Sequence, residues 1–379
     1  MRWCLFLLLL AGCAARPAEV RVAFDADRIT AVHAAGFADR TTRRRVTADD
    51  PVRVASISKL VTALGVMRMV EAGQLDLDRD VSDYLGWRLR NPAFPNTPIT
   101  LRLLLSHRAS LTDDADYLVP LGERLRDRLA DPRTWDRAHP PGAWFRYANI
   151  GFPVIASVME RAGAERFDRL MTRLVLAPLK LDACFNWSGC SAATIARAVV
   201  LHRADGSVAR DDLRGAPPAC PVIAEGACAL DDYVLGDNGA LFSPQGGLRV
   251  SMRDLARIGQ VMLRGGDGFL RAETLAAMTT PAWTFDGGNG ETERGFYCRY
   301  ALAVTALPTR RPGCADDPFG DGRRRYGHGG EAYGLRSGLW LDPVAGTGVA
   351  FFATAVPDGD RGRSAFSRAE ERLAPGRRR

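Results

Sequence analysis

The stretch "VRVASISKLVTAL" (residues 52–64) has the pattern of an opening helix, and it places Ser56 and Lys59 three residues apart. Residues three apart share one helix face, so the Ser56 hydroxyl and the Lys59 amine can meet over one turn. Serine is a weak nucleophile until a base takes its proton, and a lysine in an apolar pocket has a lowered pKa. The stretch leaves two interpretations open: a helix cap beside a solvent-facing lysine, or a nucleophile with its own base.

Lysine is rare in this chain. Of the 51 basic residues 49 are arginine, and only Lys59 and Lys180 are lysine. Arginine cannot give up its proton near neutral pH, whereas lysine can. A lysine at position 59 in such a chain therefore favours the second interpretation.

Length and composition exclude several classes of protein. The chain has 379 residues, 46% of them hydrophobic and 25% charged, which is typical of a folded globular protein rather than a disordered one. The net charge of +7 is spread along the chain, with short arginine runs at 43–45, 323–325 and 377–379. No nucleic-acid motif accompanies it, so we expect a solvated surface and no nucleic-acid partner.

The N-terminus has the features of an export signal. Arg2 precedes an apolar run at residues 3–12, which is shorter than the roughly 20 residues needed to span a bilayer. Leu10-Ala11-Gly12-Cys13 resembles a bacterial lipobox, which predicts a signal peptide over 1–13 and lipidation of Cys13. An ordinary signal with an incidental Cys13 stays open. We expect a protein of the periplasm or cell envelope whose membrane contact is a lipid anchor alone.

Six further cysteines suit an oxidising compartment. An even number in an exported chain indicates disulfides, although sequence cannot choose among the pairings. The simplest scheme pairs near neighbours, and none of the six has the C-x-x-C spacing of a zinc cluster, so we expect no metal. The candidate pairs are Cys184–Cys190, Cys220–Cys228 and Cys298–Cys314.

Strand-like segments at both ends of the chain bracket a helical middle. Alternation of apolar residues predicts strands within 19–38 and 334–356, the latter around a turn at Asp342-Pro343. Helical spacing predicts helices over 56–73, 100–180 (punctuated by Pro140-Pro141-Gly142), 251–266 and near 361–373. Residues 182–240 predict little regular structure.

Two more short motifs carry chemistry, Tyr147-Ala148-Asn149 and His328-Gly329-Gly330. A tyrosine is a general base where a cation stabilises its phenolate, and glycines at a strand edge allow a substrate backbone to lie close. Taken singly, Tyr147 also fits a core tyrosine and His328 a loop histidine. The chain has no G-x-S-x-G, H-E-x-x-H, phosphate-loop or dinucleotide motif, so we expect no cofactor.

The order S-x-x-K, Y-x-N, H-x-G resembles the serine β-lactamase and penicillin-binding-protein-like family, on the side of class C enzymes, D,D-peptidases and family VIII esterases. Residues 101–111, 176–185 and 245–259 resemble further segments of that family, and the likeness spans about residues 20–372. It implies an α+β fold, an antiparallel sheet flanked by helices. The α/β lobe would cover about 20–60 and 240–372, and an all-helical lobe about 61–240.

The resemblance also implies roles for the motif residues. Ser56 would be the acylated nucleophile, Lys59 its general base, and Tyr147 the proton shuttle to the leaving group. Asn149 would orient the substrate through its amide. The remaining substrate-binding residues would be His328 beside Tyr147, Gly330, and Glu331, whose backbone N–H would complete an oxyanion hole with that of Ser56.

The chain departs from that family's pattern at several positions. Class C β-lactamases have lysine where this chain has His328, and a histidine near its reference pKa is only partly charged at pH 7. This favours peptidase, esterase or amidase activity over β-lactamase activity. Arg108 and Ser110 replace the usual threonine and glycine. His107 is expected to be structural, and the acidic residues of 113–116 to form a solvated loop.

These observations predict a serine hydrolase that acts through a Ser56 acyl-enzyme. Its substrate would be an ester or amide: a D-amino-acid peptide, a small ester or lactone, or, weakly, a β-lactam. The alternative is a non-catalytic envelope lipoprotein that uses the same fold to bind a muropeptide or a protein partner.

Overall fold

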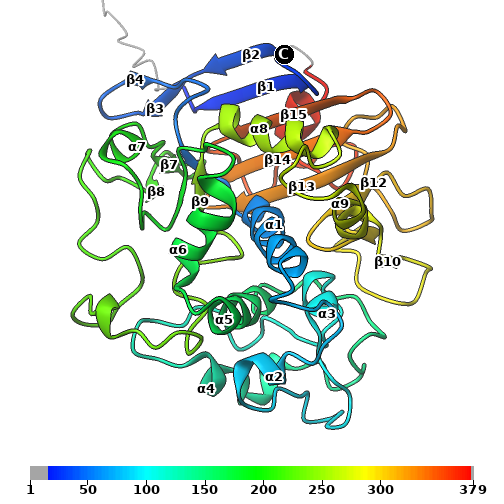
Figure 1. Cartoon of the computed structure of the whole chain (residues 1–379). Coiled ribbons are helices and arrows are strands. Elements are labelled where there is room, and N and C mark those ends of the chain that lie inside the picture. Colours follow the sequence, from blue (N-terminus) through cyan, green and yellow to red (C-terminus); the bar gives the residue numbers. More distant parts are fainter. Residues whose placement is uncertain (1–15, 377–379) are drawn as a thin grey trace, which may run out of the picture.

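A computed structural model of the chain describes residues 16–376, and a large antiparallel sheet is its main feature (Figure 1). The strands of this sheet are β1 (Glu19–Asp25), β2 (Ile29–Ala35), β10 (Trp283–Thr284), β11 (Arg299–Tyr300), β12 (Thr305–Leu307), β13 (Arg325–Ala332), β14 (Leu335–Asp342) and β15 (Thr347–Ala353). They run in the order β10-β11-β12-β13-β14-β15-β1-β2. The first hairpin of the chain therefore pairs with its last strand, with Val22 opposite Ala350.

Helices cover both faces of the sheet. The amphipathic α8 (Met252–Leu263), capped by the Ser251 side chain, packs on the face that presents Phe24 and Leu341. Successive strand residues point to opposite faces. Trp340 accordingly lies on the other face, in an apolar cluster with Phe366 beside α10 (Arg368–Leu373).

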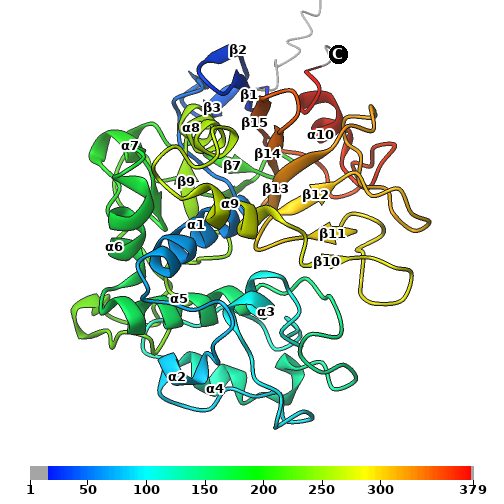
Figure 2. The ribbon, with the colours of Figure 1, turned by 45° about the vertical axis from the view of Figure 1, so that its right-hand side comes forward.

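The helix predicted from Ser56 is the central element of the molecule. It is α1 (Ile57–Glu71), and twelve of its fifteen residues are buried. A helix buried on all sides lies inside the fold. Figure 2 shows it between the sheet and α5 (Gly151–Gly163), with α9 (Ala272–Thr279) and α6 (Phe167–Met171) against its flanks.

The remaining helices are short. They are α2 (Ser82–Leu85), α3 (Leu101–Leu105), α4 (Leu125–Leu129), η1 (Pro132–Thr134), the π-helical η2 (Thr172–Leu176), α7 (Ala192–Ala196) and η3 (Leu230–Asp232). The prediction of helix throughout 100–180 is therefore too generous. His107, Ser110 and Asp116 have positive φ, and the Pro140-Pro141-Gly142 run interrupts the chain again.

Short strands correct a second expectation. β5 (Val52–Arg53), β9 (Leu248–Val250) and β6 (Cys184–Phe185) form a three-stranded sheet that leads into α1. Two hairpin-like pairs complete the list: β3 (Phe37–Asp39) with β4 (Arg44–Arg45), and β7 (Leu201–His202) with β8 (Val208–Arg210). Residues 61–240 are thus not all-helical. The predicted α+β class, an antiparallel sheet flanked by helices, is confirmed, while the lobe boundaries near residues 60 and 240 stay a prediction.

Candidate active site

The backbone before α1 presents Ser56 at a sharp turn. Ala55 has a φ of 49°, in the left-handed region that non-glycine residues rarely adopt. The turn is held because Val54 N–H donates to Leu248 O (3.0 Å) and Ser337 Oγ donates to Val54 O (3.0 Å). Ser56 occupies the N-cap position, yet its side chain makes no capping hydrogen bond. Its hydroxyl is therefore free to meet Lys59.

Lys59 is fully buried, with a relative exposure of 0%. Its Nζ lies 3.0 Å from Ser56 Oγ, 2.8 Å from Asn149 Oδ1 and 3.1 Å from the carbonyl oxygen of Gln245. Burial lowers its pKa to about 7, although the negative charges of Asp113 and Glu293 act to raise it. The solvent-facing alternative for this lysine is wrong. Near neutral pH a substantial fraction of the amine is uncharged and able to accept a proton.

Asp113 fixes the amide of Asn149. Its Oδ2 accepts from the Asn149 backbone N–H (2.7 Å) and side-chain Nδ2 (2.9 Å), and its Oδ1 accepts from Ile150 N–H (2.9 Å). This leaves Asn149 Oδ1 turned toward Lys59. The amide of Asn149 is thus engaged by two protein groups, and the expectation that Asp113 belongs to a solvated loop is wrong.

Tyr147 lies over the lysine, with Lys59 Nζ 4.7 Å from its ring centroid. Tyr297 stacks on the same ring with the centroids 4.5 Å apart, and the tilted ring of His107 lies with its centroid 4.3 Å away. Burial raises the pKa of the Tyr147 hydroxyl, and the hydroxyls of Ser56 and Tyr297 only moderate the rise. Tyr147 is therefore a protonated phenol at neutral pH. The phenolate considered from the sequence is not its resting form.

His328 lies behind the site rather than on its surface. It is fully buried, its Nε2 is 2.8 Å from Tyr300 Oη, and its Nδ1 is 2.5 Å from the carbonyl oxygen of Gly329. Burial and the charge of Lys59 lower its pKa to about 3. The expected partial charge at pH 7 is therefore wrong. Its ring centroid is 6.3 Å from that of Tyr147, which places it near that residue as predicted.

Strand β13 runs beside the serine. A Cβ on Gly330 would lie 2.3 Å from Val54 O and 3.3 Å from Ala55 Cβ, so this glycine admits the protein's own backbone rather than that of a substrate. β12 pairs with β13 only at residues 325–327, whereas β14 pairs along its whole length. Glu331 lies beyond the β12 pairing, on the edge that faces the turn before Ser56.

Four residues beside the site escaped sequence reasoning: Asp113, Glu293, Tyr297 and Tyr300. The protein around Glu293 removes part of the water from its carboxyl, and together with the carboxylate of Glu331 this raises its pKa to about 7, although the residue keeps an exposed surface. Asp113, Glu293 and Tyr297 lie in loops and Tyr300 in the two-residue strand β11, and no sequence pattern marks any of them. For Asp113 alone there is a signal. Helix α5 has no side-chain cap at its start, so a group from elsewhere must accept hydrogen bonds from its first backbone N–H groups.

The cysteines pair as the near-neighbour scheme predicts: Cys184–Cys190, Cys220–Cys228 and Cys298–Cys314. Three disulfides point to an exported protein. Cys13 and the predicted signal lie outside the described residues. Within residues 16–376, no three His, Cys, Asp or Glu side chains gather as a metal site would require, and no helix has the length and apolarity to cross a membrane.

Comparison with known proteins gives the class of this molecule. The family model described as Beta-lactamase matches residues 14–373, and the chain belongs to this family of hydrolases. Penicillin-binding protein 4* of Bacillus subtilis (strain 168) is 28% identical over 158 residues, 40% of this chain and 34% of that protein. Esterase EstB of Burkholderia gladioli is 29% identical over 170 residues, 40% of this chain and 42% of that protein.

The matched stretches span less than half the length of these two relatives. Among solved structures, the D-amino acid amidase from Ochrobactrum anthropi SV3, complexed with L-phenylalanine, has a TM-score of 0.67 at 15% identity. The likeness covers 94% of this chain and 90% of that one, and at this identity it shows the fold alone.

Proposed function

We propose that the chain is a serine hydrolase that cleaves an ester or amide through an acyl-enzyme on Ser56. The observation that carries this proposal is the 3.0 Å contact between Ser56 Oγ and Lys59 Nζ, together with a Lys59 pKa of about 7. Neutral Lys59 takes the serine proton as Oγ bonds to the substrate carbonyl carbon. The substrate carbonyl oxygen then becomes an oxyanion, held by the backbone N–H groups of Ser56 and Glu331.

Collapse of the tetrahedral intermediate expels the leaving alcohol or amine. The protonated Tyr147 gives its hydroxyl proton to that leaving atom, and the proton that Lys59 took from Ser56 returns to the phenolate oxygen. Water then attacks the acyl-enzyme and gives up a proton to Lys59. As the acid departs, Lys59 returns this proton to Ser56 Oγ, which restores both residues. Asn149, fixed by Asp113, keeps the amine in place throughout.

Both an ester and an amide suit the site. Its relatives and structural neighbours include an esterase, a D-amino acid amidase and a penicillin-binding protein by name. The neutral, buried His328 offers a substrate carboxylate no charge, which disfavours β-lactams.

We further propose export to the envelope with a lipid on Cys13, a small molecule or peptide as the partner, and no metal or cofactor.

The decisive test is covalent labelling. The purified protein is treated with a fluorophosphonate and with a fluorescent penicillin, digested, and the adduct mapped by mass spectrometry. We expect a fluorophosphonate adduct on Ser56, absent in Ser56→Ala. An adduct on another serine, or none with any acylating probe, would overturn the mechanism and favour a non-catalytic binding protein.

A further inference from the structure

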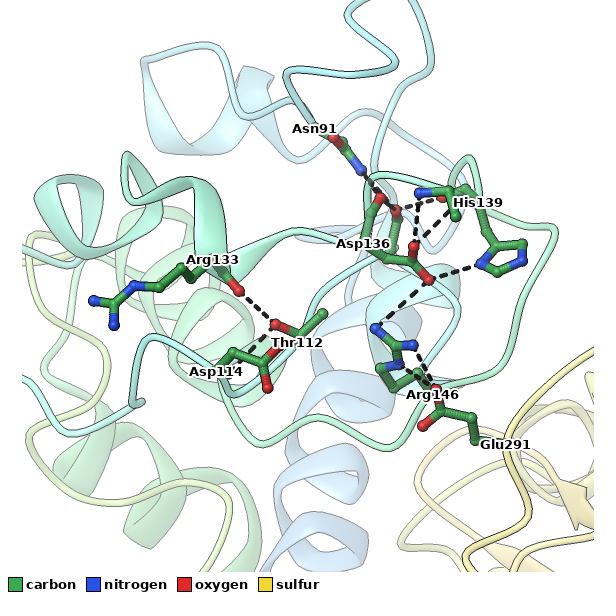
Figure 3. A network of polar contacts seen from close by, with 10 residues as sticks. Asn91, Thr112, Asp114, Arg133, Asp136, His139, Arg146 and Glu291 are labelled. Atoms are coloured by element: carbon green, nitrogen blue, oxygen red, sulfur yellow. Dashed lines mark hydrogen bonds and ion pairs between the residues drawn. The ribbon is translucent and has the colours of Figure 1, made fainter.

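The segment of residues 285–298 is fixed against the chain that carries Tyr147. Phe145 N–H donates to Asn289 O (3.2 Å), and Glu291 N–H donates to Phe145 O (2.9 Å). The Arg146 guanidinium binds the Glu291 carboxylate (Nε–Oε1 2.8 Å) and also reaches Asp136 at 3.7 Å (Figure 3). The segment is therefore placed by protein contacts before any substrate arrives.

Between its fixed ends this segment makes an unusual turn at Glu293. Glu293 and Arg294 have φ values of 46° and 61°, two adjacent non-glycine residues in the left-handed region. Thr292 O accepts from Tyr297 N–H (2.9 Å), and the Tyr297 ring stacks on Tyr147. Such a backbone persists only where its surroundings hold it, and such residues concentrate at functional sites.

Glu293 differs from the other acids around it. Asp113, Glu291 and Glu331 act electrostatically on its carboxyl, and it acts in turn on Lys59. Asp113 is engaged by backbone N–H groups, and Glu291 and Glu331 each have an arginine partner. Within residues 16–376, the Glu293 carboxyl makes no hydrogen bond or ion pair, and its side chain reaches solvent. When Lys59 is neutral, the site presents an uncompensated negative charge.

We propose that Glu293 selects substrates whose leaving group carries a positive charge, an amine or quaternary ammonium attached to the ester or amide. This inference rests on the proposed function. Glu293 acts on the leaving group rather than on the acyl group of the substrate. The reason is that its segment stacks on Tyr147, the residue that protonates the departing atom. A cation there restores charge balance through an attraction that solvent and salt partly screen.

The test uses two thioesters of the same shape, acetylthiocholine and 3,3-dimethylbutyl thioacetate, assayed by thiol release at pH 8.5. At this pH Lys59 is neutral and Glu293 ionised. We expect the wild type to prefer the cationic ester by about tenfold in kcat/KM, equivalent to about 1.4 kcal/mol. Glu293→Gln should remove most of this preference, while Glu273→Gln, an exposed acid on α9, should retain it. Added salt should weaken it in the wild type.

Fluorophosphonate labelling of Ser56 and a circular dichroism spectrum establish that each variant is folded and competent. A wild type that labels at Ser56 but hydrolyses both thioesters equally, or neither, overturns the inference alone. So does an unchanged ratio in Glu293→Gln. Absence of any Ser56 adduct in the wild type overturns the proposed function instead.

Discussion

Lys59 determines how the rate should depend on pH. Its amine is a base only when neutral, and the neutral fraction grows as pH rises through its pKa of about 7. We therefore expect kcat/KM for a neutral ester to rise up to about tenfold per pH unit below pH 7 and to level off above it. The measurement is a pH–rate profile from pH 5 to 9. A flat profile across this range would contradict the assignment of Lys59 as base.

Substituting the two lysines separates charge from proton transfer. Arginine retains the charge of Lys59 but cannot become neutral, so Lys59→Arg should lower kcat/KM by about 1,000-fold or more. Lys180 is exposed and takes no part in the contacts of the site, so Lys180→Arg should keep wild-type activity. Steady-state kinetics on both variants checks this pair, and appreciable activity in Lys59→Arg would count against the mechanism.

Asp113 should matter through the residue that it positions. Asp113→Asn removes the charge that fixes Asn149, and the hydrogen bond from Lys59 to the Asn149 amide then weakens. We expect kcat/KM to fall about 10- to 100-fold. Replacing hydrogen bonds from a carboxylate to backbone N–H groups should also lower the free energy of unfolding by about 1–2 kcal/mol. Kinetics and urea denaturation test both effects. The exposed neighbour Asp114, substituted as Asp114→Asn, is the control and should change neither.

Residue chemistry was predictable from sequence where spacing alone brings groups together. Ser56 and Lys59 are three apart on a helix, and that spacing predicted their contact. The role of Asp113 was not predictable, because it depends on a loop with unusual backbone angles meeting the start of α5. The charge of His328 was wrongly predicted because burial beside Lys59, which sequence does not show, decides its pKa.

At the scale of elements, β13 must lie close to the strand that precedes Ser56. In Gly330→Ala the new Cβ would lie 2.3 Å from Val54 O and 2.4 Å from Ser337 Oγ, so β13 would have to move away. We expect activity to fall at least about 100-fold, and stability by about 1–3 kcal/mol. Gly359→Ala is the control, because nothing lies within 4 Å of its Cβ position. Full activity in Gly330→Ala would contradict this close packing.

Elements with a strong local signal were predicted closely. The hairpin of β1 and β2, the capped helix α8 and the pair β14–β15 all follow from alternation or helical spacing over several turns. Short elements were missed, since β5, β6 and β9 contain two or three residues each and depend on partners far away in the chain. Their positions, which hold the turn before Ser56, come from tertiary pairing rather than local propensity.

At the scale of the molecule, the disulfides offer a test that separates stability from catalysis. Removing Cys298–Cys314 or Cys220–Cys228, each as a double alanine variant, should lower stability by a similar amount, about 2–3 kcal/mol from the lost restriction of the unfolded chain. Only the first pair adjoins the site, because Cys298 directly follows Tyr297, which stacks on Tyr147. We expect C298A/C314A to lose about tenfold in kcat/KM and C220A/C228A to stay near wild type. Thermal unfolding and steady-state kinetics below both melting transitions measure the two effects. Equal loss of activity in the two variants would mean that the disulfides act through global stability alone. The placement of Tyr297 would then not depend on the Cys298–Cys314 bond.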